Sequence, residues 1–423
     1  MNIRIPLIAI LLLAISAVGV TILIKEQSRP FKQVALNQSQ HTWEMKSIDT
    51  MKYSRDKAKE RLNDRSFDSI IEAQVKAISQ TGATHIAIAT PYDKEFLPYL
   101  TRWVAMARKY YLNVWFRGNF SGWEGWFGYP QTLSREEHLR MTREFISQNP
   151  TLFANHDAFT PCPECENGGP GDPRQTGERE GYRKFLIDEY NAANSEFAAI
   201  GKDVAVNYNS MNFDVAKIIM DKQTTASLGG IVAIDHYVDT PDSLVSSVRE
   251  LARLSGGKIF LGEFGVPLPD INGDMNEDEQ ASWVEEALRK LIVEPSVMGV
   301  SYWVNTGGPT GLWNENGTPR KAAKILQSYF LPKVVSGTVS DQYNNPIPNV
   351  SVRSQYTQSL SDASGEFSIS VLPFEKNISA QANGHQAITY AIPQNAEKLK
   401  IIIEKSPQSL IDYLKDLIYK NLK

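Results

Sequence analysis

Short apolar runs alternate with amphipathic segments from residue 43 to about residue 330. Runs of this kind, bounded by turn residues, are typical of buried strands. We expect eight of them, at 43–48, 84–90, 112–117, 157–160, 203–207, 230–237, 258–263 and 297–303. Eight strands separated by helices is the pattern of a (β/α)₈ TIM barrel, so we predict an α/β fold of that kind over residues 43–330.

The segments between the expected strands have the marks of helices. One group of apolar residues recurs at helical spacing and predicts a single buried stripe: Phe67, Ile70, Ile71, Val75 and Ile78. Ser134 with Glu137, and Asn276 with Glu279, have the spacing of capping boxes. Each pair therefore predicts the start of a helix.

Beyond residue 330 the hydrophobic pattern changes to strict alternation. Residues 335–341 and 365–371 alternate apolar and polar side chains, as half-buried strands do. No long helical pattern interrupts 331–405, so we predict a small antiparallel β-sandwich there. The last segment, 406–423, carries leucines on one face and lysines elsewhere, which predicts an amphipathic helix. That helix either packs on the sandwich or contacts a membrane surface or partner.

Three motifs in this second region resemble those of carboxypeptidase-regulatory-like (transthyretin-like) modules. They are Gly337 to Val339, Pro346 to Val350 and Asp362 to Phe367. The resemblance implies a spacer or binding module rather than a catalytic one.

The amino terminus begins with an uncharged apolar stretch. Residues 5–24 lie between Arg4 and Lys25, and about 20 such residues span a bilayer. Small residues at 14–19 also suit cleavage by a signal peptidase. We predict that residues 1–25 form an N-terminal transmembrane helix or a signal segment, followed by a polar linker, 26–42. The protein is then anchored in the membrane and extracytoplasmic, or secreted if the segment is cleaved.

Charge and cysteine content narrow the possible partners. The formal net charge is −4, which leaves no basic excess for binding nucleic acid. The two cysteines, Cys162 and Cys165, lie in one Cys-Pro-Glu-Cys segment. A zinc site usually needs a second pair of ligands, and the chain has no further cysteines. The pair therefore forms either a small disulfide or two free thiols, with zinc the least favoured alternative.

Glu263 is the strongest candidate for chemistry. It ends the apolar run 258–263, where an unpaired buried acid would be costly. The carboxyl ends of barrel strands form the active-site mouth, so an acid there points to catalysis. The alternative is a structural glutamate paired with an arginine. A second acid, Glu164 or Glu166, follows the fourth expected strand in a glycine-rich loop.

The positions of these acids, with Trp303 at the end of the eighth strand, resemble clan A glycoside hydrolases, the cellulase-like barrels. The resemblance covers residues 43–330. It implies a retaining hydrolase in which Glu263 is the nucleophile and Glu164 or Glu166 is the acid/base. The family usually has Asn-Glu at the fourth strand, whereas this chain has Pro163-Glu164. That departure removes the expected asparagine contact to the sugar.

Other side chains near the expected strand ends suit a sugar cleft. Trp303 is expected to form a platform under the sugar, while Tyr237 and Arg117 are expected to contact the Glu263 carboxylate. The remaining candidates for substrate binding are His236, Asn207, Asn209, Trp123 and Trp126. The alternatives are core packing for the aromatic residues, a rim salt bridge for Arg117 and turn formation for the asparagines.

We therefore expect a glycoside hydrolase that cleaves O-glycosidic bonds of a polysaccharide or glycan outside the membrane. This chemistry needs two carboxyl groups and neither a metal nor an organic cofactor. The main alternative is a non-catalytic surface carbohydrate-binding protein with a degenerate barrel site. A third hypothesis is an adhesion or envelope-structural protein.

Overall fold

The computed structural model describes residues 43–393 and 398–406. The predicted anchor or signal segment, the linker and nearly all of the predicted C-terminal helix lie outside these residues. Within the described ranges, no helix is long and apolar enough to cross a membrane.

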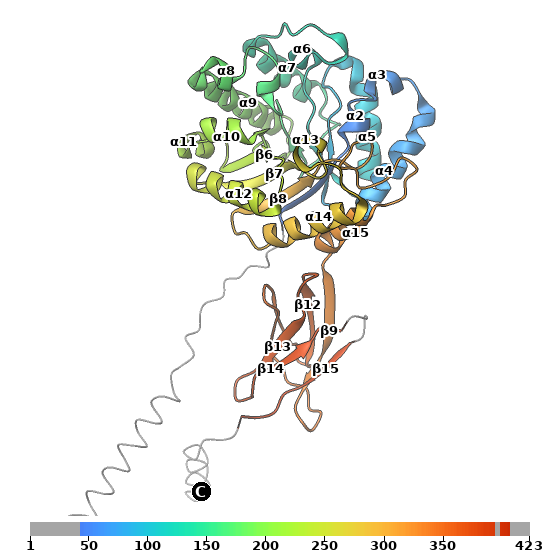
Figure 1. The fold of residues 1–423 in the computed structure, drawn as a ribbon, viewed down its shortest axis with the longest axis vertical. Helices are drawn as coiled ribbons and strands as arrows, with labels where there is room; N and C mark the ends of the chain where they lie inside the picture. The colour runs from blue at the N-terminus through green and yellow to red at the C-terminus, as the bar shows by residue number, and fades with distance from the viewer. Residues whose placement is uncertain (1–42, 394–397, 407–423) are drawn as a thin grey trace, which may run out of the picture. The chain divides into compact units, whose positions relative to one another are not determined.

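The first region is an α/β barrel of eight parallel strands (Figure 1). The strands are β1 (Met45–Asp49), β2 (His85–Ile88), β3 (Asn113–Phe116), β4 (Ala158–Phe159), β5 (Ser210–Asn212), β6 (Ile231–Asp235), β7 (Lys258–Phe264) and β8 (Val297–Tyr302). Their order in the sheet is β4-β3-β2-β1-β8-β7-β6-β5. Seven of the eight expected strands therefore overlap the observed ones.

The fifth strand differs from its predicted position, 203–207. Residues 210–212 form β5 and pair with β6, while Ala205 makes a parallel bridge to Ala158 of β4. The amide of Phe159 donates to the carbonyl of Ala205 at 2.8 Å, which closes the barrel on this side. The stretch around Ala205 therefore pairs with β4, and residues 210–212 pair with β6. The predicted range, 203–207, contains only the first of these two stretches.

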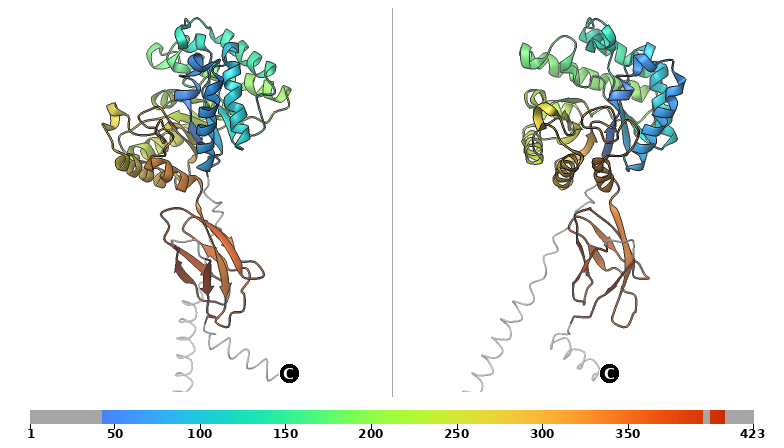
Figure 2. Two further views of the ribbon diagram at one scale, coloured as in Figure 1. Left: turned by 90° about the vertical axis from the view of Figure 1, so that its right-hand side faces the viewer. Right: turned by 45° about the vertical axis from the view of Figure 1, so that its right-hand side comes forward.

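Helices surround the strands on the outside of the barrel (Figures 1 and 2). The longer ones are α4 (Asp68–Gln80), α5 (Leu97–Lys109), α7 (Arg135–Gln148), α9 (Arg179–Ala199), α12 (Pro241–Ser255), α14 (Glu277–Leu291) and α15 (Lys321–Phe330). The shorter ones are α2 (Met51–Ser54), α3 (Ala58–Arg61), α6 (Ser121–Glu124), α8 (Pro173–Thr176), α10 (Phe213–Ile219), α11 (Lys222–Ser227) and α13 (Pro269–Asn272).

The predicted helix signals are confirmed with one exception. Both capping boxes are present, at the starts of α7 and α14. In α4 the buried stripe consists of Ile71, Val75 and Ile78, but Ile70 is 43% exposed. At 100° per residue Ile70 lies off the line of the other three, so its assignment to the stripe is wrong.

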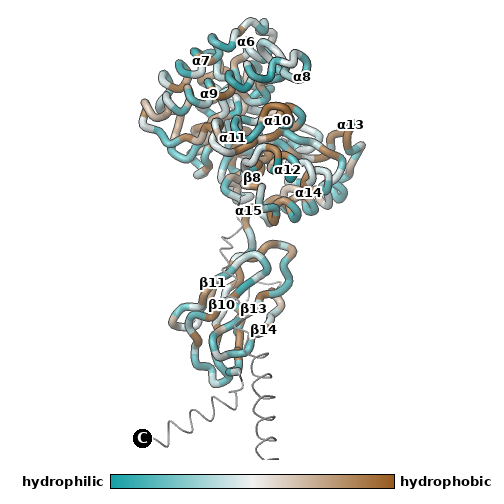
Figure 3. Tube along the Cα trace, turned by 90° about the vertical axis from the view of Figure 1, so that its left-hand side faces the viewer, coloured by the Kyte–Doolittle hydropathy of each residue, from teal (hydrophilic) through white to brown (hydrophobic). Residues whose placement is uncertain are grey.

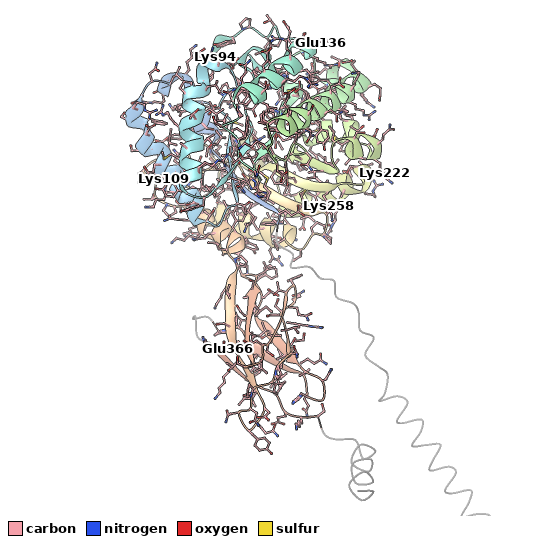
Figure 4. All side chains as sticks on the ribbon, turned by 180° about the vertical axis from the view of Figure 1, so that it is seen from behind. Lys94, Lys109, Glu136, Lys222, Lys258 and Glu366 are labelled. Carbon is pink, nitrogen blue, oxygen red and sulfur yellow. A yellow bond between two sulfur atoms is a disulfide. The ribbon has the colours of Figure 1, made fainter. Side chains whose placement is uncertain are left out.

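The outer helices are amphipathic. Brown and teal segments alternate along α12 and α14 in Figure 3, and the buried positions of α12 include Leu244, Val248 and Leu251. Exposed charged residues such as Lys109 and Lys222 project from the outer surface (Figure 4). Charged groups on that surface remain solvated, so buried charges inside the barrel need a separate explanation.

A layer of apolar side chains fills the lower part of the barrel interior. It includes Met45, Ala87, Trp115, Tyr208, Ala233 and Phe260. The rings of Trp115 and Tyr208 both meet Phe260 edge to face, with centroids 5.3 and 4.9 Å away. Because side chains of a strand repeat every two residues, Arg117 and Asp235 lie on the same side of their strands as Trp115 and Ala233.

The second region consists of two small sheets with a shared apolar core. Its strands are β9 (Lys333–Ser340), β10 (Ser351–Arg353), β11 (Gln358–Leu360), β12 (Glu366–Val371), β13 (Asn377–Gln381), β14 (Ile388–Ala391) and β15 (Leu399–Ile402). Their orders are β11-β10-β13-β14 and β12-β9-β15. The core includes Val339, Val352, Phe367, Ile378 and Ile401.

The prediction of a purely antiparallel sandwich is wrong for one pair of strands. β15 pairs with β9 in parallel, from Leu399 opposite Gly337 to Ile402 opposite Ser340. After β14 the chain leaves one sheet for the other and enters beside β9 in the same direction. A separated pairing of this kind leaves no mark in the local alternation of the sequence.

The capping box of α14 provides a test of the helix assignments. The side-chain oxygen of Asn276 accepts from the amides of Asp278 and Glu279, at 2.9 and 3.1 Å. We expect Asn276→Ala to lower the free energy of unfolding by about 1 kcal/mol, because these amides lose their partner. Urea unfolding followed by circular dichroism measures the change. Asn191→Ala, on the exposed face of α9, is the control, and equal midpoints for both variants would contradict the cap.

Candidate active site

Arg117 lies at the centre of a buried cluster of charges at the carboxyl ends of the strands. It follows β3 and is 1% exposed. Its Nη1 donates to Asp49 at 2.9 Å and to Glu263 at 2.5 Å, and its Nη2 donates to Asp235 at 2.7 Å. Its guanidinium also lies over the ring of Trp115, 4.7 Å from the centroid. One cation therefore binds three carboxylates from β1, β6 and β7.

Glu263 reaches this cluster because β7 is irregular at that point. The register between β6 and β7 shifts after Ile234, so that Asp235 is opposite Glu263. Gly262 lies at the shift, and a Cβ there would be 2.5 Å from the Asp235 carboxylate. A bulge of this kind redirects a side chain, and only glycine leaves room for the neighbouring acid.

Two donors hold the Glu263 carboxylate in place. Arg117 binds Oε1, and the hydroxyl of Tyr237 donates to Oε2 at 2.7 Å. Burial raises the pKa of Tyr237 well above its usual value, so the hydroxyl remains a donor. The predicted contacts of Tyr237 and Arg117 with Glu263 are present. Glu263 is thus a buried acid, 5% exposed, with a fixed orientation.

The loop after β4 brings Glu164 to the same place. Cys162 and Cys165 form a disulfide across the loop, so the predicted disulfide is confirmed and the free thiols are not. Glu164 lies inside this small ring with a left-handed backbone, φ 45°, and its amide donates to the carbonyl of Ser210 on β5 at 2.8 Å. The disulfide and this hydrogen bond fix the backbone of a residue that has no regular secondary structure.

The Glu164 carboxyl group differs electrostatically from a surface glutamate. Burial first, and then the negative charge of Glu263, raise its pKa to about 8, while Arg117 opposes the shift. No described residue donates a hydrogen bond to this carboxyl group. It is therefore protonated at neutral pH and free to act on a ligand.

Glu166, the alternative acid, has a different environment. Its Oε2 accepts from the hydroxyl of Tyr182 at 2.9 Å. Its Oε1 accepts from the backbone and side-chain amides of Asn212, at 2.7 and 2.9 Å. Both carboxylate oxygens of Glu166 accept hydrogen bonds from the protein, and those from Asn212 connect the loop to β5.

Three acidic residues of the mouth were missed in the sequence. Asp49 and Asp235 end β1 and β6, and both satisfy the strand-end rule that singled out Glu263. Burial raises the pKa of Asp49 to about 6 and that of Asp235 well above its usual value. The third, Glu124 in α6, accepts from the Asn119 amide at 2.7 Å, and burial raises its pKa to about 7.

Trp303 follows β8 and lies beside Tyr237. The two rings meet edge to face at 5.8 Å, and the Lys52 ammonium lies 5.5 Å from the centre of the indole. Its Nε1 is buried without a hydrogen-bond partner among the described residues. The ring is half-buried, so part of it remains accessible.

His236 and Asn209 also carry buried polar atoms without a partner among residues 43–393 and 398–406. These are the Nε2 atom of His236 and the Nδ2 atom of Asn209. His236 stacks on Phe213 at 4.2 Å, and burial lowers its pKa to about 4, so the ring is neutral at pH 7. Such atoms normally have a partner, and a hydroxyl-rich ligand would supply one.

Asn207 is not brought to the mouth. Its amide contacts the carbonyl of Gly229 at 3.4 Å, and Gly229 precedes β6 at the opposite end of the barrel. Residue 207 lies three positions before β5, so the predicted end of the fifth strand was placed too early. The carboxyl end of that strand is at Asn212, whose side chain binds Glu166.

The aromatic loop after β3 divides between the core and the surface. Trp123 is 1% exposed, stacks on Phe185 and donates to the carbonyl of Cys165 at 3.2 Å. Its predicted role as a sugar subsite is therefore wrong, because neither face is accessible. Trp126 is half-buried, and the Arg55 guanidinium lies 5.1 Å from the centre of one of its rings.

No protein-family model and no curated protein matches the sequence. Among solved structures, the chain is similar to an FMN-binding β-glucuronidase from Facaelibacterium prausnitzii L2-6, at 12% identity and a TM-score of 0.44, over 78% of this chain and 54% of that one. It is similar to a β-glucuronidase from Bacteroides uniformis, at 12% identity and a TM-score of 0.43, over 79% and 44%. β-Glycosidase BGL167 matches at 12% identity and a TM-score of 0.44, over 69% and 96%. The chain spans about half the length of the two β-glucuronidases.

The raised pKa of Glu164 predicts a pH-dependent stability. Between its unfolded pKa, near 4.5, and its folded pKa of about 8, the folded protein binds more protons than the unfolded chain. The free energy of unfolding therefore falls as the pH rises through this window. We expect Glu164→Gln to be more stable than wild type at pH 8 and equal to it at pH 4.5, as measured by urea unfolding at both values. A stability difference that does not change with pH would contradict the shift.

Proposed function

We propose that the protein is a retaining glycoside hydrolase that cleaves O-glycosidic bonds of a polysaccharide or glycan. One observation carries the proposal. A carboxylate held by two donors, Glu263, faces a second carboxyl group, Glu164, whose pKa is raised by burial and by the charge of Glu263. A carboxylate beside a carboxyl group that keeps its proton is the arrangement that acid-assisted glycoside cleavage requires.

In this proposal Glu263 is the nucleophile. Arg117 and Tyr237 orient its carboxylate and leave the remaining lone pairs of its oxygens for the anomeric carbon. The glycosyl–oxygen bond breaks as the Glu263–carbon bond forms, which gives a covalent glycosyl-enzyme. When Glu263 loses its negative charge on esterification, the positive charge of Arg117 stays paired with Asp49 and Asp235.

Glu164 is the acid and then the base. Its raised pKa keeps the proton in place until the leaving oxygen takes it. Once Glu263 is esterified, its negative charge, which adds to burial in raising the Glu164 pKa, is removed. The pKa of Glu164 then falls, and the carboxylate accepts a proton from the water that attacks the intermediate.

The neighbouring polar and aromatic groups support a sugar as the ligand. The half-buried face of Trp303 suits the C–H groups of a pyranose, because an aromatic face is electron-rich. The unpartnered atoms of Trp303, His236 and Asn209 offer hydrogen bonds to hydroxyl groups. Of the two predicted asparagines, Asn209 alone remains a candidate for binding the sugar, because Asn207 lies away from the mouth.

We further propose that the enzyme acts outside the membrane, anchored by its N-terminal segment or released by cleavage. The disulfide between Cys162 and Cys165 supports this, since disulfides persist in oxidising compartments. The second region, 331–405, is proposed to be a non-catalytic module.

A carbohydrate-binding protein without catalysis is the second candidate. It is favoured by the ion pairs that Arg117 makes with Glu263 and two further acids, because a glutamate paired with an arginine also has a structural role. Turnover distinguishes the two candidates, whereas binding does not.

Replacement of the nucleophile is the first test. We expect Glu263→Gln to lower kcat/KM by about 10⁴-fold or more, because the covalent step is lost. Release of nitrophenol from a panel of p-nitrophenyl glycosides measures the loss, and circular dichroism verifies the fold. Glu285→Gln, an exposed change on α14, is the control. Unchanged turnover in Glu263→Gln would reject the nucleophile role.

The pH dependence of turnover tests the acid. We expect kcat/KM for a p-nitrophenyl glycoside to fall as the pH rises through about 8, because Glu164 loses the proton it must donate. In Glu164→Gln this alkaline limb is expected to disappear for a dinitrophenyl glycoside, whose leaving group needs no proton. Glu166→Gln is expected to keep the limb. A limb that depends on Glu166 instead would exchange the roles of the two residues.

A further inference from the structure

A cavity lies between helix α4 and the loop that follows β8. It has a volume of about 290 Å³ and is lined by residues that include Tyr53, Phe67, Gln74, Asn305, Trp313 and Glu315. This volume is close to the lower limit of ligand pockets, roughly 300 Å³. It therefore suits one small group rather than a macromolecule.

Asn305, which lines this cavity, carries an unsatisfied acceptor. The residue is 1% exposed, and its Nδ2 donates to Gln74 at 2.8 Å. Its Oδ1 is buried without a hydrogen-bond partner among the described residues. A buried acceptor without a donor costs about 1–3 kcal/mol, so a ligand hydroxyl placed here would be stabilised.

The backbone of Asn305 is fixed on both sides, so this acceptor is held in place. Its amide donates to the carbonyl of Asp49 at 2.9 Å, and its carbonyl accepts from the amide of Trp313 at 2.9 Å. Asp49 also binds Arg117 through its side chain. Asp49, at the end of β1, thus contacts both Asn305 of the cavity and the arginine that orients Glu263.

The aromatic side chains of the cavity supply flat surfaces. The ring of Tyr53 stacks on Phe67 at 6.1 Å, and Trp313, 9% exposed, also lines the cavity. Glu315 is the one charged residue among those that line the cavity, and its negative charge adds to burial in raising the pKa of Tyr53. Aromatic faces with amide groups and an acid favour a neutral sugar over a carboxylated one.

The cavity adjoins the mouth of the barrel. Asn305 follows Trp303 by two residues, and Tyr53 follows Lys52, whose ammonium lies over the Trp303 indole. Gly307 fits between these elements, since a Cβ there would be 3.0 Å from the Tyr53 ring. The cavity and the Trp303 ring are therefore formed by the same two segments, 52–53 and 303–305.

We propose that this cavity is an accessory subsite for a neutral sugar residue of the glycan whose scissile bond lies between Glu164 and Glu263. The proposal rests on the proposed function for the position of that bond. It also requires that a longer neutral oligosaccharide gain affinity from Asn305 and its aromatic neighbours.

Filling the cavity from α4 tests the subsite. Ala73 is exposed and lines the cavity, so Ala73→Trp fills it with little risk to the fold. The binding of neutral tetrasaccharides (cello-, xylo-, manno- and N-acetylchito-series) is measured by calorimetry in the Glu263→Gln background, which prevents turnover. We expect one series to bind and Ala73→Trp to weaken it about tenfold, the equivalent of one lost contact of about 1.4 kcal/mol.

Lys76→Trp, exposed on the same helix and outside the cavity, is the matched control and is expected to leave binding unchanged. If Ala73→Trp does not fold, Ala77→Leu fills the same cavity from the next turn. Equal affinities in the filled and control variants, or no binding by any neutral tetrasaccharide, would overturn the proposal. So would a tetragalacturonate that alone loses affinity when the cavity is filled.

The two proposals fail separately. If Ala73→Trp weakens binding but wild type hydrolyses no member of the panel, the subsite stands and the hydrolase falls. If Glu263→Gln abolishes turnover but filling the cavity changes no affinity, the hydrolase stands and the subsite falls.

Discussion

The binding of three carboxylates by one buried guanidinium is the interaction on which the site depends. Arg117 joins Asp49, Asp235 and Glu263, which come from β1, β6 and β7. A buried charge without partners would cost several kcal/mol, so each acid requires the arginine and the arginine requires the acids. Burial and the negative charge of Glu263 together raise the pKa of Glu164, which is why that residue retains its proton.

The barrel provides this cluster through two devices with different physical origins. The two-residue repeat of the strands places Arg117 above Trp115 and Asp235 above Ala233, so the apolar core becomes a polar mouth within one step along each strand. The bulge at Gly262 then turns Glu263 toward Arg117. Regular pleating alone would not bring Asp235 and Glu263 to the same guanidinium.

Much of the barrel could be predicted because strand runs and helix caps are local signals. Trp303, Tyr237, Arg117, Glu263 and Glu164 were found by one rule, that barrel chemistry collects at carboxyl strand ends. The same rule applies to Asp49 and Asp235, which were missed because Asp49 lies one residue beyond the predicted first strand, 43–48, and Asp235 lies inside the predicted sixth strand, 230–237. The accessory cavity could not be found in this way, because it joins residues 53 and 305 through contacts without a local pattern.

The errors share a cause as well. Trp123 lies in a loop rich in glycine, yet it packs on Phe185 of a helix more than 60 residues away in the chain and its ring is enclosed. Asn207 was placed at a strand end because the fifth strand is divided between two neighbours. In each case the tertiary partner, rather than the local sequence, determines what the side chain faces.

The most direct measurement is mass spectrometry of the protein after reaction with 2-deoxy-2-fluoro glycosides that carry a good leaving group. Such compounds form the covalent intermediate of a retaining hydrolase faster than it is hydrolysed. We expect the added sugar mass on the peptide that contains Glu263. Attachment to Glu164 or Glu166, or turnover of ordinary glycosides with no labelled peptide, would contradict the role of Glu263 as nucleophile.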